Sequence, residues 1–184
     1  MPYSFPITGS ELFITITAAK DAQVDDINKT LSVLDRKADG KIFQLFDADK
    51  ITGPYHLYFA AANAHYALEN GSNISNKLDV ETLLYASTQN QISTAIKMIG
   101  VSGRTQRVAV AVISGKENDP LAMQIAETLG IRDDKVLEPS PEKYEALKKL
   151  YEITGIAIET IEGDSYKALT SLITEKSTLI SLRR

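Results

Sequence analysis

The sequence predicts an α/β fold with a small central mixed β-sheet of about four strands, flanked by helices, and a helical C-terminal half. The run Val108 to Ile113 is apolar at every position, which is typical of a strand buried on both faces of a sheet. Two further runs, Leu12 to Thr17 and Lys41 to Phe46, are rich in the β-branched and aromatic residues of strands. Segments with helical periodicity lie between and after these runs, so we expect helices on both faces of the sheet.

The helices are predicted from apolar periodicity and from signals at their ends. Pro54 suits the first turn of one helix, where its missing N–H is no loss. In another, Asn90 is the expected N-cap and Gly100 the expected left-handed residue at the C-terminus. The tail predicts a helix from Tyr166 to Leu182, and Lys135 to Leu137 is the candidate for one more short strand.

Length and composition limit the class of protein. The 184 residues suit one domain, 1–184, without a linker rich in Gly, Ser or Pro. The chain contains no cysteine, and its formal net charge of −4 argues against free-standing, charge-driven binding of nucleic acid. Neither a leader sequence nor a membrane-spanning run is recognised, so we expect a cytoplasmic protein without a membrane partner.

The residues that usually carry catalysis are scarce, so the sequence favours a protein that is not an enzyme and needs no cofactor or metal. The two histidines, His56 and His65, fall on roughly opposite faces of one predicted helix and cannot share a metal ion. A lone histidine in an alanine-rich helix is more often a packing residue than a base. A small hydrolase or transferase that uses carboxylates remains an alternative.

A glycine pair at Gly100 and Gly103, followed by Arg104, matches the GxxG loop of one class of RNA-binding domain. In that class the loop joins two helices, whereas here it precedes a predicted strand. A helix-end glycine and a turn glycine explain the same residues, and both interpretations stay open.

The last helix carries more apolar residues than one buried face requires. Its apolar residues cover an arc of about 200°, whereas a helix on its own domain needs roughly 100°. They are Tyr166, Ala168, Leu169, Leu172, Ile173, Leu179, Ile180 and Leu182. The spare apolar surface predicts a protein partner, and the alternative is that the helix lies deep in a groove of its own fold.

Two motifs resemble those of one known family. The stretch NKLDVETLLYASTQNQISTAIKMIG, Asn76 to Gly100, is similar to the signature of the KEOPS (EKC) complex Cgi subunit family, the TPRKB-like kinase-binding subunits. The segment TEKSTLISL, Thr174 to Leu182, resembles the closing helix of that family. The resemblance and the order of elements cover nearly the whole chain, which would then be a single Cgi-type domain.

The resemblance implies a non-catalytic adaptor of the KEOPS complex, which installs threonylcarbamoyladenosine in tRNA. The expected partner is the small atypical kinase subunit, with the threonylcarbamoyl transferase subunit as an indirect partner. The kinase-facing positions implied are Leu172, Ile173, Glu175, Lys176, Leu179 and Ile180.

Archaeal members of the family also capture the single-stranded CCA end of tRNA. The tRNA-binding positions implied here are Lys77, Asn90, Gln91 and Ile92, with Arg104 and Arg107 as phosphate contacts. This chain departs from the family pattern, since Thr88 replaces a glycine and Asn90 an arginine. Because asparagine cannot neutralise phosphate, we rank kinase docking above tRNA capture and keep a stand-alone RNA-binding module as the alternative function.

Overall fold

The central sheet, seen in a computed structural model, is antiparallel throughout. The structure describes residues 1–182, the last two by their backbone alone. Within this range the strands lie in the order β1 (Tyr3–Pro6), β2 (Phe13–Lys20), β4 (Val108–Ser114) and β3 (Ile42–Asp47), and β5 (Ile131–Arg132) also pairs with β2. The predicted α/β class is confirmed, but the sheet is not mixed. The reason is that β4 lies between β2 and β3, so these two strands, which run in the same direction, never pair.

Strand β4 is the centre of the fold, and its alternation divides the core into two parts. Val108, Val110 and Val112 pack against α1 (Ile27–Ala38) and α5 (Asp119–Leu129) on one face of the sheet. The alternate residues Ala109, Ala111 and Ile113 face the other side. All of these side chains are buried, which confirms that helices cover both faces of this strand.

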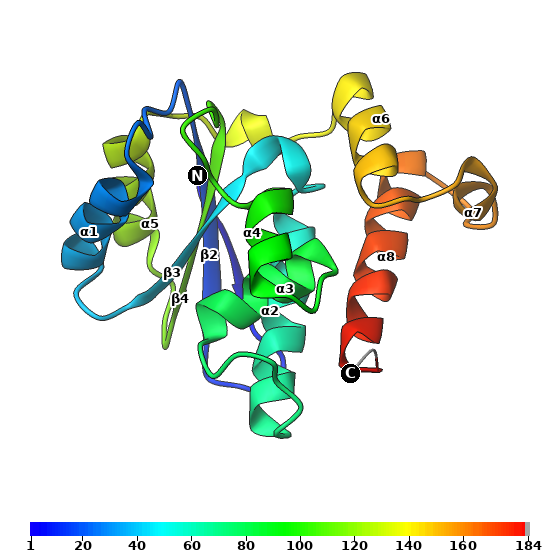
Figure 1. Ribbon diagram of the computed structural model, residues 1–184, viewed down its shortest axis with the longest axis horizontal. Helices are drawn as coiled ribbons and strands as arrows, with labels where there is room; N and C mark the ends of the chain where they lie inside the picture. The colour runs from blue at the N-terminus through cyan, green and yellow to red at the C-terminus, as the bar shows by residue number, and fades with distance from the viewer. Residues whose placement is uncertain (183–184) are drawn as a thin grey trace.

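The second face of the sheet is covered by α2 (Pro54–Glu69), α3 (Leu78–Ser87) and α4 (Ile92–Ile99). Figure 1 shows α1 and α5 on one side of the sheet and these helices on the other. Beyond them lie α6 (Pro141–Leu150), α7 (Gly155–Glu159) and α8 (Ser165–Thr178), and α8 packs against α2 and α3. The 3₁₀ turns η1 (Ala48–Lys50), η2 (Asp134–Leu137) and η3 (Leu179–Leu182) complete the described chain.

The ends of α4 differ from the sequence-based expectation. Gln91, not Asn90, is the N-cap residue. Gly100 follows the helix in an extended conformation, with φ −71° and ψ 163°, and not in the left-handed one. A Cβ at Gly100 would come within 2.5 Å of the Ile96 carbonyl oxygen. The helix therefore ends in glycine because of a close backbone approach.

Two boundaries in the C-terminal half are also corrected. The segment predicted as a strand, Lys135 to Leu137, forms the 3₁₀ turn η2, and the strand pairing occurs earlier, in β5. The Asp133 side chain accepts a hydrogen bond from the Lys135 N–H, which closes the chain into that turn. The predicted tail helix ends as α8 at Thr178 and continues as η3.

Candidate functional site

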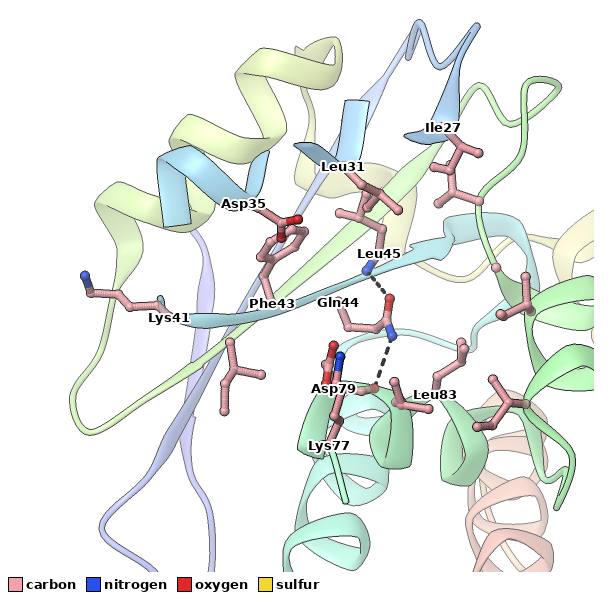
Figure 2. A pocket seen from close by; sticks show the side chains of 16 residues that line it. Ile27, Leu31, Asp35, Lys41, Phe43, Gln44, Leu45, Lys77, Asp79 and Leu83 are labelled. Carbon is pink, nitrogen blue, oxygen red and sulfur yellow. Dashed lines mark hydrogen bonds between the residues drawn. The ribbon is translucent and has the colours of Figure 1, made fainter. Parts of the chain in front are cut away.

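A groove of about 490 Å³ runs along the outer edge of β3. Helix α1 overhangs the strand from one face of the sheet, and α3 and α4 overhang it from the other (Figure 2). Because β3 is an edge strand, its main chain forms the floor of the groove. The apolar walls are formed by Ile27, Leu31, Val80, Leu83, Ile92, Ile96 and Val101.

Gln44 partly occupies the open edge of β3. Its Oε1 accepts a hydrogen bond of 2.9 Å from the Leu45 N–H, and its Nε2 donates one of 3.1 Å to the Asp79 carbonyl oxygen. The Leu45 N–H thus points away from the sheet. Because alternate residues of a strand direct their N–H and C=O groups to the same side, those of Phe43 also point away from the sheet. Figure 2 shows this bridge between β3 and the start of α3.

The rim of the groove carries apolar side chains and charges of both signs. Ile92 and Ile96, on α4, are 41% and 51% exposed. Lys77 and Asp79 lie at the start of α3, and Lys41 precedes β3. The apolar side chains of such a groove can contact a planar or aliphatic group, and its lysines can bind a negatively charged group.

The positions implied for tRNA binding fall into two places. Lys77 and Ile92 both line the groove beside β3, and Gln91 immediately precedes Ile92 as the N-cap of α4, next to Asn90. Arg104 and Arg107 line a separate, polar depression together with Lys20, Asp21, Asp47, Asp49, Thr105, Gln106 and Val136.

The charge of Arg107 is already engaged. Its Nε lies 2.8 Å from Asp49 Oδ1, whereas no ion pair is seen for the exposed Arg104 within the described part of the chain. The structure therefore brings Lys77 and Ile92 together and leaves the two arginines apart from them.

The positions implied for kinase binding lie on α8 and η3 with very different exposure. Ile173 and Ile180 are buried in the protein's own core, and Leu172 is half-buried against it. Glu175 is exposed, and Leu179 is 40% exposed. The side chain of Leu182 lies outside the described residues.

Lys176, the remaining position implied for kinase binding, is half-buried and holds the end of α6. Its Nζ donates a hydrogen bond of 2.7 Å to the Tyr151 carbonyl oxygen and lies 3.8 Å from Glu152 Oε2. Most of the apolar arc of α8 is thus used inside the protein, because α2, α3 and α7 all pack against this helix.

An aromatic stripe on α2 was missed by the sequence analysis. Tyr55, Phe59 and Tyr66 are 61%, 42% and 68% exposed, and they occur at spacings of four and seven residues, so they share one face of the helix. Helix α8 packs beside α2, and both run in the same direction (Figure 1). The spacing of these aromatic residues is visible in the sequence.

His56 is a structural residue, as predicted. Its Nδ1 accepts a hydrogen bond from the Thr52 N–H, so the proton lies on Nε2, which donates to the Ala86 carbonyl oxygen at 3.0 Å. The Tyr151 hydroxyl lies 3.1 Å from the same oxygen and 2.9 Å from that of Lys50. Burial lowers the pKa of His56 to about 4, so its imidazole is neutral at pH 7.

The fold and these surfaces define a class of protein: a small α/β protein with a groove at an open sheet edge and an exposed aromatic helix face, features suited to binding other molecules. The sequence model described as kinase binding protein CGI-121 matches residues 19–180, and the chain belongs to this family of kinase-binding proteins. This confirms the family resemblance. No curated protein matches the chain.

The described residues include no helix with the length and apolar character to span a bilayer. They also include no cluster of three or more His, Cys, Asp or Glu residues arranged to hold a metal ion.

Proposed function

We propose that the protein is a non-catalytic adaptor subunit of the KEOPS complex, which binds the small kinase of that complex and supports threonylcarbamoyladenosine modification of tRNA. The observation that carries the proposal is membership of a family of kinase-binding proteins across residues 19–180. In this role the protein, a single domain over residues 1–184, acts in the archaeal cytoplasm, and the threonylcarbamoyl transferase subunit is an indirect partner.

The proposed kinase-docking surface, termed the α2–α8 surface, combines the aromatic stripe of α2 with the exposed residues of α8 and η3. Tyr55, Phe59 and Tyr66 supply large apolar contact area, which is enriched at the energetic centres of interfaces. Leu179 and Glu175 lie on the neighbouring element. The other implied positions support this surface by fixing α8 against the core; they are Leu172, Ile173, Lys176 and Ile180.

Titration calorimetry with the purified kinase tests this surface. The double variant Phe59→Glu with Leu179→Arg should weaken binding by about 30-fold or more, because it places charges where an interface excludes water. Ile131→Arg is the matched control, since Ile131 is 59% exposed and lies on β5 beside α5. If the double variant binds as tightly as the wild type, the docking surface is elsewhere. If the wild type does not bind the kinase at all, the adaptor role fails.

A second function, capture of the tRNA 3′ CCA end, is favoured by the arrangement of the groove beside β3. Lys77 and Ile92 line the same groove, where a lysine can contact phosphate and apolar walls can contact bases. Asn90 stands where the family pattern has an arginine, which removes one cation from the segment just before α4.

Gel shifts with intact tRNA and with tRNA that lacks its CCA end test this function. Intact tRNA should bind more tightly, Lys77→Glu should remove that difference, and the exposed Lys149→Glu should not. Equal binding of both tRNAs would contradict end capture. Strong tRNA binding without any partner, with a steep loss as salt rises, would instead support a stand-alone RNA-binding module.

A further inference from the structure

A cavity of about 520 Å³ lies between the starts of α2 and α8, apart from the groove beside β3. Its apolar wall includes the aromatic side chains Tyr3, Tyr55, Phe59 and Tyr166, together with Pro54, Leu137 and Pro139. A concave site of a few hundred Å³, mostly apolar and with a few polar groups, is typical of small-molecule binding. We call it the α2–α8 cavity.

The first turn of α2 borders this cavity without a side-chain cap. Gly53 is the N-cap residue, with φ 142°, and no side chain accepts a hydrogen bond from the turn. A Cβ at Gly53 would lie 3.1 Å from the Leu137 carbonyl oxygen, so Ser or Asp, which could cap the helix, fits poorly. The main-chain N–H groups of Tyr55 and His56, and the positive end of a 16-residue helix, are thus available to an anion.

Two hydroxyl groups in the cavity wall are buried and lack hydrogen-bond partners among the described residues. Thr52, which is only 4% exposed, lines the cavity immediately before α2, and its Oγ1 has no partner. The Tyr166 hydroxyl, at the start of α8, is also buried and has no partner among the described residues. A buried hydroxyl without a partner destabilises a protein, so a ligand that bonds to it regains that free energy.

The remaining polar groups around the cavity set its electrostatic character. Both ring nitrogens of His56 are engaged inside the protein, so this residue is not free to bind a ligand. Lys167 and Glu138 are the charged residues of the cavity lining, and both are exposed. Burial and, to a smaller extent, the Glu138 carboxylate raise the pKa of Tyr3, so the acidic charge lies toward β1, whereas Lys167 lies on α8.

We propose that the α2–α8 cavity binds a small carboxylic acid that carries a flat apolar ring. The carboxylate lies at the start of α2, where it accepts hydrogen bonds from the first-turn N–H groups and from the Thr52 hydroxyl. The ring lies against Tyr55, Phe59 and Tyr166. Tyr55 and Phe59 belong both to this cavity and to the α2–α8 surface, but the experiments below use the free protein, so they do not depend on kinase or tRNA binding.

Titration of the ¹⁵N-labelled protein with phenylacetate, followed by NMR, tests the site directly. The amide signals of Tyr55 and His56 should shift, and the neutral analogue phenylacetamide should bind about tenfold more weakly, because it lacks the charge. Acetate, which lacks the ring, should bind too weakly to saturate. Equal affinity for phenylacetate and phenylacetamide, or no shift in the first turn of α2, would overturn the proposal.

Opposite effects on stability and binding distinguish a binding hydroxyl from a structural one. Thr52→Val should weaken phenylacetate binding by about tenfold and should raise the thermal stability of the free protein. Ser177→Ala is the matched control, because Ser177 also has a buried hydroxyl without a partner but does not line the cavity. The control should gain stability and keep its affinity. A Thr52→Val protein that binds phenylacetate as well as the wild type would overturn the proposal.

The sign of the ligand charge is tested at the rim. Lys167→Gln should weaken phenylacetate binding and Glu138→Gln should strengthen it, each by about twofold to fivefold, because both residues are exposed. The reverse pattern would mean that the cavity prefers a cation and would overturn the carboxylate assignment.

Discussion

The two faces of the sheet are stabilised in different ways. On the side of α1 and α5, the core consists of aliphatic side chains such as Leu34, Ile125 and Leu129. On the side of α2 and α3, the buried residues include His56 and Glu81, whose side chains bind the main chain of neighbouring segments. The first side is therefore held mainly by packing, with a hydrogen bond from the Asn118 N–H at the start of α5 to the buried Thr15 hydroxyl. On the second side, buried ring and carboxylate groups bind the main chain and position the segments around α2 and α3.

The largest effect that sharpens this comparison is expected for Leu34→Ala. Leu34 is fully buried on α1, and its truncation should lower the free energy of unfolding by about 3 kcal/mol, mainly through the cavity it leaves. Urea denaturation at pH 5 and at pH 8 should give the same difference between variant and wild type. A loss below about 1 kcal/mol would mean that α1 packs loosely.

An effect of similar size is expected from pH on the other side of the sheet. The folded protein protonates His56 only near pH 4, while the unfolded chain does so near pH 6.5. The stabilising contribution is thus complete above pH 6.5 and falls by up to about 3 kcal/mol as the pH drops toward 4. Urea denaturation across this range should show the loss in the wild type and in His65→Gln. If His56→Gln shows the same loss, other groups cause it.

A loss of about 2 kcal/mol is expected for Glu81→Gln. The Glu81 carboxylate is buried and accepts hydrogen bonds from the N–H groups of Ile74, at 3.1 Å, and Ser75, at 2.7 Å. The amide of glutamine cannot accept with both of its heavy atoms, and the charge that strengthens these bonds is lost. Thermal unfolding measures the change, with the exposed Glu145→Gln as control.

The smallest expected effect is a gain in stability. Lys143 is 8% exposed, and burial lowers its pKa to about 8, so at pH 7 the folded protein holds a poorly solvated charge. Lys143→Met removes this charge but also the hydrogen bond from Nζ to the Val136 carbonyl oxygen. The net result should be an increase of about 1 kcal/mol in the free energy of unfolding at pH 7. The gain should shrink as the pH rises above 8. Lys149→Met, at an exposed position, should change little.

The strands and helices that were predicted well are those whose own residues decide their structure. The run Val108 to Ile113 is a buried central strand because each of its residues is small or β-branched and apolar. Strand β1 was missed, since Tyr3–Pro6 is short, ends in proline and is held only by pairing with β2. Strand β5 was misplaced for the same reason, because its two residues depend on the far end of β2.

The candidate site was predictable only where residues are close in sequence. Lys77 and Ile92 were named from one continuous motif, and the fold keeps them in one groove. The apolar arc of α8 was visible in the sequence, but periodicity does not reveal that α2, α3 and α7 pack against it. The α2–α8 cavity was not predicted at all, because Thr52 and Tyr166 are separated by more than a hundred residues and meet only in the tertiary structure.

The bridge that Gln44 makes has a consequence for the behaviour of the protein in a crowded cell. An uncovered edge strand offers its main chain to any other extended polypeptide and can begin the growth of a shared sheet. By holding the Leu45 N–H with its own amide, Gln44 takes one of the donors that an incoming strand needs. One side chain, anchored to α3, thus makes this edge of the sheet a poorer template for an added strand.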